Sequence, residues 1–262
     1  MVTYKQFHFF ENWKEFKKWY DTQNITREIT AVHEHHTWKP DYSYFKGDMN
    51  PQIEPWENHD TLMENLDNYH ELALKWRDSG HHIATFKDGV IATARDLNWA
   101  PASIYGNNTG AVCIENMGNF DRGHDMMTEA QKESVLGVTA TILNRHELEP
   151  NTDTILYHHW FDQDTGKRTN GEWGNVKTCP SHNFFGGNKV KDCEENFIPL
   201  IKQKLKEMEE KQMKDYKEIL KEKTDSPDVW IKLCDDLENG YIELENIQTL
   251  QWLKVLVEKL GN

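Results

Sequence analysis

The chain has 262 residues and a formal net charge of −14 at pH 7. Its length suits one sizeable domain of about 150 to 200 residues with an appendage. The acidic balance excludes nucleic acid as an expected partner, because phosphate binding depends on clustered Lys and Arg. The N-terminus lacks a signal-peptide pattern, and no stretch reaches the roughly 20 apolar residues that cross a bilayer. We therefore expect a product made in the cytoplasm without membrane insertion.

Helix and strand patterns alternate in the first part of the chain. Residues 10–22 carry aromatic side chains at helical spacing, and residues 28–35 alternate like a strand that ends in histidine. Residues 60–76 suit an amphipathic helix. Residues 82–94 predict a hairpin, because their Asp-Gly pair favours a tight turn between strands.

The next elements continue this alternation. Residues 110–117 form a short apolar strand that contains Glu115, and a charge in a central strand is costly unless it is paired or functional. Thr128 and Gln131 predict a capping box ahead of a helix, and residues 154–158 form the next strand, again ending in histidine. The pattern predicts an α/β fold with a mixed central β-sheet flanked by helices and a site along one edge of the sheet.

Composition changes after about residue 197. Residues 200–224 are rich in Lys and Glu and predict one long helix. Ser226-Pro227 starts a further helix that Asn239-Gly240 ends, and a last helix is expected over 246–260. We expect a main domain over residues 1–198, a charged helical linker over 199–225 and a small helical unit over 226–262.

The residue types that carry chemistry are histidine and cysteine. Two histidine pairs, His35-His36 and His158-His159, accompany a Lys-Thr-Cys-Pro segment that contains Cys179. Thiolate plus imidazole suits Zn²⁺, and three protein ligands leave a fourth position for water, which indicates hydrolysis. The chain has neither the His-Glu-x-x-His of metalloproteases nor the Pro-Cys-x-x-Cys of zinc deaminases. The four cysteines are irregularly spaced, so we expect them to be reduced.

Several ordered segments resemble zinc-dependent N-acetylmuramoyl-L-alanine amidases of the type 2, peptidoglycan-recognition-like family. They are His35-His36-Thr37, Gly80-His81-His82, Lys87-Asp88-Gly89 with Arg95, Asn108 with Gly110–Glu115, Gly118-Asn119-Phe120, His158-His159 and Lys177-Thr178-Cys179-Pro180. The resemblance covers roughly residues 25–190 and looks most like the phage and prophage endolysin branch.

The resemblance implies roles for individual residues. His35, His158 and Cys179 align with the zinc ligands of the family. Lys177 aligns with a catalytic lysine that some members use, and Glu115 matches the acid that other members use to activate water. The chemistry agrees, because zinc lowers the pKa of a bound water to about 7 and polarises an amide carbonyl. A carboxylate can then move the proton, and a fixed positive charge stabilises the oxyanion.

Other positions are assigned with alternatives. His81 stands where the family often has Tyr, so it either replaces that catalytic group or lies at the surface. Asn108 is expected to bind substrate. Trp38 and Trp160 are expected to line a glycan groove, with ordinary packing as the alternative for each ring. His182, close to Cys179 in sequence, competes as a metal ligand, and the long polar segment before Cys179 is expected to form a loop over the site.

The resemblance predicts an enzyme that cuts the amide bond between N-acetylmuramic acid and L-alanine in peptidoglycan, as an endolysin or autolysin. It would reach the wall after release through a membrane-permeabilising partner. The C-terminal unit would target the wall or form a homodimer. Two alternatives stay open: a cysteine hydrolase with Cys179 as nucleophile, and a non-catalytic peptidoglycan-binding module, which typically lacks the cysteine ligand.

Overall fold

The structure is a computed structural model that describes residues 1–4, 6–45, 55–223 and 227–238. It divides into two compact units, Met1–Lys204 and Leu205–Asn262. The expected functional boundaries at residues 198 and 225 stay predictions. No helix in the described ranges combines the length and the apolar character that a membrane span requires.

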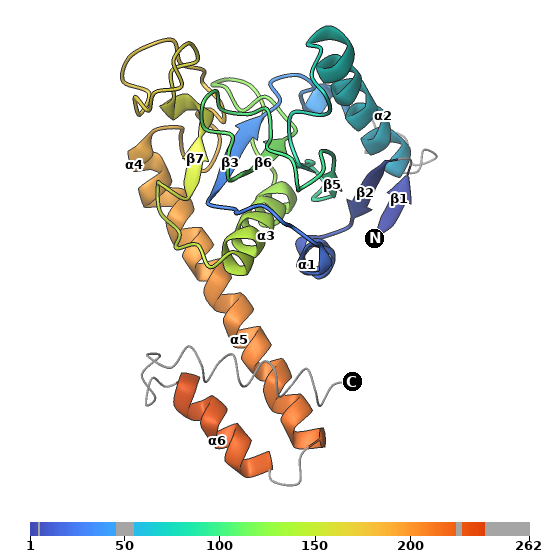
Figure 1. The fold of residues 1–262 in the computed structure, drawn as a ribbon, viewed down its shortest axis with the longest axis vertical. Helices are drawn as coiled ribbons and strands as arrows, with labels where there is room; N and C mark the ends of the chain where they lie inside the picture. The colour runs from blue at the N-terminus through green and yellow to red at the C-terminus, as the bar shows by residue number, and fades with distance from the viewer. Residues whose placement is uncertain (5, 46–54, 224–226, 239–262) are drawn as a thin grey trace. The chain divides into compact units, whose positions relative to one another are not determined.

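The first unit contains a seven-stranded mixed sheet in the order β1-β2-β5-β4-β6-β3-β7 (Figure 1). The strands are β1 (Val2–Tyr4), β2 (Phe7–Phe10), β3 (Ala31–His36), β4 (Ile83–Thr85), β5 (Ile91–Thr93), β6 (Ala111–Asn116) and β7 (Ile155–Tyr157). Neighbours among β4, β6, β3 and β7 run parallel, whereas β1, β2, β5 and β4 pair antiparallel. Together with the flanking helices, this sheet confirms the predicted fold class.

Helices cover both faces of the sheet. The described residues form the helices α1 (Trp13–Thr22), α2 (Pro55–Asn68), α3 (Glu129–Arg145), α4 (Val190–Asp192), α5 (Ile198–Lys223) and α6 (Pro227–Glu238), the last of which belongs to the second unit. Phe10 of β2 packs edge-on against Phe16 of α1, whereas Phe9 joins a buried cluster with Leu62 and Met63 of α2. Because successive strand residues point to opposite faces, α1 and α2 lie on opposite faces of the sheet.

A close approach between α1 and α3 depends on one glycine. A Cβ added at Gly137 would lie 2.1 Å from the ring of Trp13, which no side chain could tolerate without movement. The indole Nε1 of Trp13 donates a hydrogen bond of 2.8 Å to Glu133 of α3. The two helices therefore form one layer behind the sheet.

Several predicted elements need correction. The expected helix over 10–22 begins only at Trp13, because Phe7–Phe10 forms a strand that pairs with β5. The helix expected over 60–76 starts at Pro55, ends at Asn68 and continues as a π-helical turn, Tyr69–Ala73. The stop at Asn239-Gly240 and the last helix, over 246–260, lie outside the described residues.

The capping box predicted for α3 forms only in half. The Oγ1 of Thr128 accepts a hydrogen bond of 3.1 Å from the backbone N–H of Gln131, as an N-cap should. The side chain of Gln131 does not return to Thr128. Its Nε2 donates instead to the carbonyl oxygens of Thr85 and Met117, both at 3.0 Å, and so ties α3 to the sheet.

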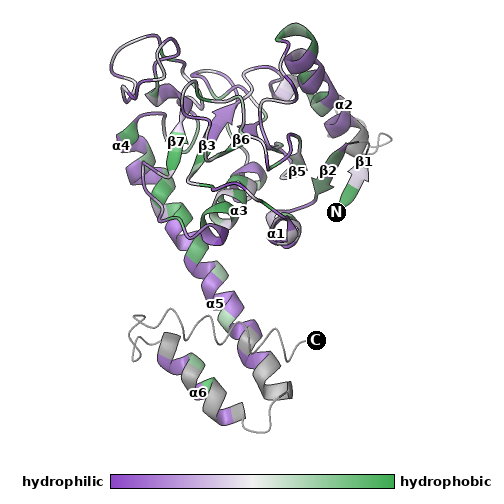
Figure 2. Cartoon of the chain, in the orientation of Figure 1, coloured by the Kyte–Doolittle hydropathy of each residue, from purple (hydrophilic) through white to green (hydrophobic). Residues whose placement is uncertain are grey.

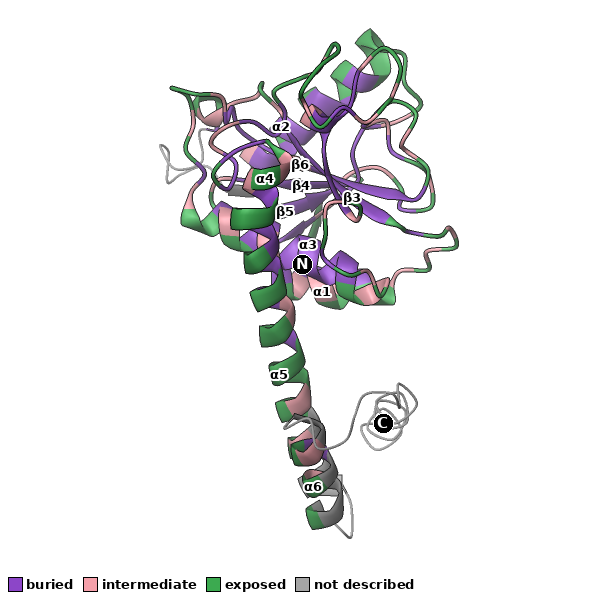
Figure 3. Cartoon of the chain, turned by 90° about the vertical axis from the view of Figure 1, so that its left-hand side faces the viewer, coloured by how far each residue is buried: buried purple, intermediate pink, exposed green. Residues whose placement is uncertain are grey.

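Strand β3 is hydrophilic although it lies in the interior of the sheet. Figure 2 shows its polar character, and all six of its residues are buried, as Figure 3 shows. Glu34 faces α3, where its carboxylate accepts hydrogen bonds from Thr139 Oγ1 at 2.7 Å and Asn116 Nδ2 at 3.0 Å. Asn116 Nδ2 also donates to the carbonyl oxygen of His35 at 2.8 Å. This network fixes the backbone that carries His35.

Glu34→Gln is expected to make stability less dependent on pH. Burial raises the pKa of Glu34 from 4.5 to about 7, although hydrogen bonds from Thr139 and Asn116 oppose the change. The folded state thus holds this proton more tightly than the unfolded chain. Its contribution is fully present below pH 4.5 and is lost as pH rises through about 7.

Between these limits the wild type should lose up to about 3 kcal/mol relative to the variant, at about 1.4 kcal/mol per pKa unit. Denaturant unfolding of both proteins from pH 4.5 to pH 8, at one fixed zinc concentration, measures this difference. Parallel stability curves for the two proteins would contradict the prediction.

Candidate functional site

Three candidate metal ligands meet at one edge of the sheet. His35 is in β3, and His158 follows the last residue of β7 directly. Glu34 pairs with Tyr157 in parallel register, so the next residues along, His35 and His158, lie side by side. Their Nδ1 atoms are 3.2 Å apart. With Cys179, their ligand atoms all lie within 4.8 Å of one another.

The arrangement fits a tetrahedral metal ion. Two nitrogen ligands at the Zn–N distance of about 2.0–2.1 Å would lie about 3.3 Å apart, close to the separation of the two Nδ1 atoms. The sulfur of Cys179 is held in place, because the backbone N–H of His36 donates to its Sγ at 3.3 Å. The backbone N–H of His159 donates to the carbonyl oxygen of Cys179 at 2.7 Å, which fixes the loop.

The protonation of these groups also suits a metal. Burial lowers the pKa of His35 well below its usual range and the pKa of His158 to about 3, with further lowering by nearby positive charge. Both imidazoles are therefore neutral, which is the form that binds metals. Burial raises the pKa of the Cys179 thiol, so a bound cation would be needed to stabilise its thiolate.

The three residues open into a pocket of about 670 Å³ that also holds Glu115 and Lys177. Glu115 of β6 pairs with His35 in register, on the strand next to β3. Burial raises its pKa to about 8, and the positive charge of Lys177 opposes this change. Lys177 extends from the exposed loop before Cys179. The pocket therefore brings a carboxyl group and an ammonium group to the candidate ligands.

The other predicted substrate contacts divide into two groups. Trp38 lines the pocket with its side chain 53% exposed, as a substrate-binding ring would be. Trp160 is fully buried, stacks on Tyr157 and donates a hydrogen bond of 2.7 Å to the carbonyl oxygen of Asn188. The prediction that Trp160 contacts substrate is therefore wrong, because its ring belongs to the core.

His81 and Asn108 have structural surroundings. His81 is fully buried against His70, with 6.0 Å between ring centroids, and it is not among the residues that line the pocket. This burial contradicts the surface alternative, and the catalytic assignment of His81 stays a prediction. The Oδ1 of Asn108 accepts from the backbone N–H groups of Ser103 and Ile104, both at 3.0 Å, so it stabilises a turn beside the pocket. Its predicted substrate contact stays a prediction.

The competing ligand His182 lies outside the group of three. Its Nδ1 is 3.2 Å from the hydroxyl of Ser181, whose Oγ also hydrogen-bonds Asp121. His182 does not line the pocket that contains Cys179. The geometry therefore favours His35 and His158 as the imidazole partners of Cys179.

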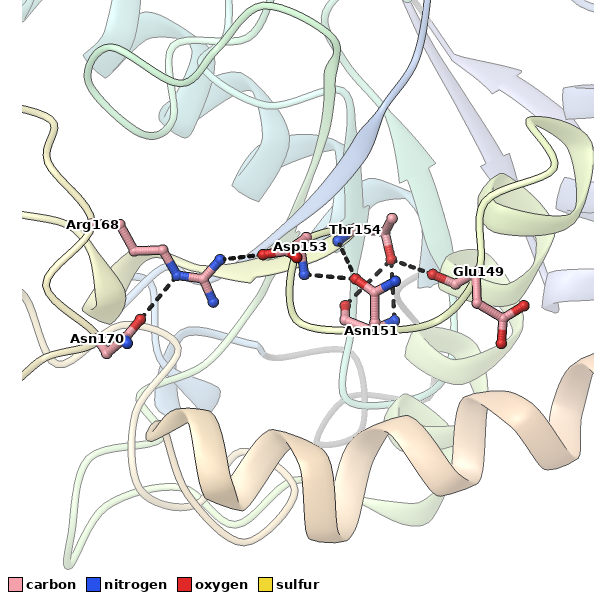
Figure 4. Close-up of polar contacts among 6 residues, drawn as sticks. All are labelled: Glu149, Asn151, Asp153, Thr154, Arg168 and Asn170. Carbon is pink, nitrogen blue, oxygen red and sulfur yellow. Dashed lines mark hydrogen bonds and ion pairs between the residues drawn. The ribbon is translucent and has the colours of Figure 1, made fainter.

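The polar segment between His158 and Cys179 is anchored to the turn that leads into β7 (Figure 4). Arg168 binds Asp153 of that turn at 2.7 Å and donates from Nε to Asn170 at 2.9 Å. The Oδ1 of Asn151 accepts from the backbone N–H groups of Asp153 and Thr154. One set of contacts thus holds the segment and the start of the strand that leads to His158.

One wall of the pocket, formed by α2 and the turns after it, was not predicted from the sequence. Its residues are Leu66, Tyr69, His70, Leu74 and Trp76. The ring of Trp76 stacks on His70 with centroids 4.9 Å apart. The available signal was the run of large side chains in the second half of the helix that was expected over residues 60–76.

The fold and the site together define an α/β protein with a candidate metal centre of two imidazoles and one thiol. The family model of N-acetylmuramoyl-L-alanine amidase, Amidase_2, matches residues 25–182, and the chain belongs to this family. No curated protein matches the chain.

Solved structures with a similar fold include peptidoglycan recognition proteins and endolysins. Wild-type PGRP-LB of Drosophila is 18% identical with a TM-score of 0.46, over 62% of this chain and 81% of that chain. The endolysin amidase LysCS from Clostridium intestinale is 19% identical with a TM-score of 0.40, over 60% and 78%. PGRP-SA of Apis mellifera is 16% identical with a TM-score of 0.45, over 66% and 89%. These similarities concern the fold alone.

Proposed function

We propose that the chain is a zinc-dependent amidase that cuts the bond between N-acetylmuramic acid and L-alanine in bacterial peptidoglycan. The observation that carries this proposal is the grouping of His35, His158 and Cys179 within 4.8 Å. The same pocket holds Glu115 and Lys177, and the family supports the reaction class. The resemblance to phage and prophage endolysins supports a lytic role on the wall, with residues 1–198 as the catalytic part.

His35, His158 and Cys179 would hold the zinc ion. When bound, zinc acidifies water and polarises a carbonyl group. Glu115 takes a proton from the attacking water and delivers it to the amine nitrogen that leaves as the amide C–N bond breaks. The ammonium group of Lys177 stabilises the negative charge that develops on the carbonyl oxygen. The products are the carboxylate of the muramic acid side chain and a free L-alanine amino group.

Product analysis with purified cell walls tests the proposal. The full chain should release new L-alanine amino termini without new reducing ends, lose activity in a chelator and regain it with added zinc. Elemental analysis should find about one zinc per chain. Activity that survives the chelator but is lost on thiol alkylation would identify a cysteine hydrolase instead. Wall binding without any product would identify a binding module.

Lys177→Met is expected to lower kcat by about 10² to 10³, the cost of removing one oxyanion donor. Because Lys177 is exposed, the thermal midpoint and the zinc content should not change. Lys177→Arg keeps the positive charge and should retain most of the activity. Steady-state kinetics of the two variants measures the difference, and equal kcat values for Lys177→Met and the wild type would exclude the role.

A further inference from the structure

His36 is the last residue of β3 and follows the candidate ligand His35 directly. Its side chain is only 7% exposed, yet it lines the same pocket as Lys177 and Cys179. The ring is held flat against Phe120, with 6.0 Å between centroids and an interplanar angle of 29°. The metal-ligand role predicted for this pair falls on His35 alone, so His36 is a pocket residue without an assigned function.

One hydrogen bond fixes the tautomer of His36. The backbone N–H of Phe120 donates to His36 Nδ1 at 3.1 Å. A backbone N–H can only donate, so Nδ1 must be the unprotonated nitrogen of the ring. The imidazole is therefore neutral and carries its single proton on Nε2.

The Nε2–H group of His36 is available to a ligand. Within the described ranges no hydrogen bond to this atom is found. The buried polar atoms without a partner include His33 Nε2, His35 Nε2 and both ring nitrogens of His81, but they do not include His36 Nε2. This nitrogen therefore has no hydrogen bond within the described part of the chain, and His36 is one of the residues that line the pocket.

His36 lies next to the candidate metal centre, where the amide would react. The backbone N–H of His36 donates to Cys179 Sγ at 3.3 Å, so the residue adjoins the candidate metal centre. Asp121 and Lys177 line the same pocket as His36. A neutral N–H donor in this position suits a carbonyl oxygen as its acceptor. Because Nδ1 accepts a hydrogen bond from Phe120, the proton of the ring stays on Nε2.

We propose that His36 binds the substrate by donating a hydrogen bond from Nε2–H to the carbonyl oxygen of the amide that is cut, beside Lys177. The inference rests on the proposed amidase function. In this role His36 is a second, uncharged donor to the oxyanion, and the hydrogen bond from Phe120 orients its ring before substrate binds. A donor that is already oriented stabilises developing charge without the cost of reorganisation.

Two substitutions at His36 test separately the hydrogen bond donated from Nε2 and the hydrogen bond accepted from Phe120 at Nδ1. In His36→Asn the side-chain oxygen can still accept from the N–H of Phe120, but no donor reaches the position of Nε2. In His36→Gln the amide nitrogen can reach that position, but the acceptor for Phe120 is lost. We expect His36→Asn to lower kcat by about 10² to 10³ with normal zinc content and thermal midpoint, and His36→Gln to be at least tenfold more active than His36→Asn.

A purely structural role for His36 predicts the reverse order. His36→Asn would then be as active as the wild type and His36→Gln would lose activity together with thermal stability, and this result would overturn the proposal. A binding measurement makes the test independent of turnover. N-acetylmuramoyl-L-alanine, titrated calorimetrically into chelated protein, should bind His36→Asn about 3- to 10-fold more weakly than the wild type.

The two measurements also separate this inference from the amidase proposal. A wild type that binds the probe without cleaving walls would refute the amidase, while the binding ratio would still decide the role of His36. Equal binding by the wild type and His36→Asn would refute the role of His36, whatever the catalytic outcome.

Discussion

Cys179→Ser is expected to remove the bound zinc and, with it, the amidase activity. Cys179 is the only sulfur in the candidate ligand group, and a serine hydroxyl is a much poorer ligand for zinc than a thiolate. Substitution of a residue that hydrogen-bonds a metal ligand typically lowers metal affinity 10- to 100-fold. Loss of a ligand itself should therefore lower zinc affinity by more than about 100-fold. Elemental analysis after dialysis against a defined zinc concentration, with product assays on the same samples, measures both effects.

Cys113→Ser is the matched control for this experiment. Cys113 is also a buried cysteine that lines the pocket, but it does not belong to the ligand group. Its variant should retain about one zinc per chain and activity within roughly fivefold of the wild type, as expected for a near-isosteric change away from the ligands. A Cys179→Ser protein that keeps its zinc but loses activity would favour the nucleophilic alternative over the metal centre.

The positions of the candidate ligands could be inferred from sequence because two of them lie where strands end. His35 is the last residue but one of β3 and His158 directly follows β7, and parallel strands present their carboxyl ends at the same edge of a sheet. Cys179 has no such local signal, since it lies in a loop, and only the resemblance of its segment to the family identified it. Glu115 was found because an acid in a central strand is costly without a purpose.

The errors have a common physical cause, which is that side-chain direction depends on contacts distant in sequence. Trp160 is buried by Tyr157 and a bond to Asn188, and no local pattern indicates which side of the chain its ring will take. The same holds for His81, which the π-helical turn after α2 covers through His70. The tautomer of His36 likewise depends on the backbone N–H of Phe120, a contact between the last residue of β3 and the loop after β6 that periodicity does not reveal.

Strand β2 was not predicted, for a different reason. Residues Phe7–Phe10 pair with β5 on one side and β1 on the other, so three of the four residues are buried and no alternation is visible. Four residues with only one polar member, His8, are too few for periodicity to distinguish a strand from the start of the helix that follows. The aromatic spacing of the following helix, α1, then extended the predicted helix backwards by three residues, to Phe10.

Glu115→Gln is expected to lower kcat by about 10² to 10⁴, the usual contribution of a general acid–base group. The amide has nearly the same shape as the carboxyl but cannot take the proton of water, so zinc content and thermal midpoint should stay unchanged. The alternative, in which Glu115 is only a strand residue paired with a nearby charge, predicts that the variant keeps the wild-type kcat.

The pH dependence of kcat/KM further distinguishes a catalytic Glu115 from a Glu115 that is only a paired strand residue. Burial raises the pKa of Glu115 to about 8 and the charge of Lys177 lowers it. Since the ionised carboxylate is the base, activity should rise with pH through this pKa, and bound zinc should move the rise to lower pH by favouring the anion. Removing the positive charge in Lys177→Met should move the rise to higher pH, whereas Lys177→Arg should leave it in place. The rise should be absent in Glu115→Gln, and a rise that persists there unchanged would assign it to another group.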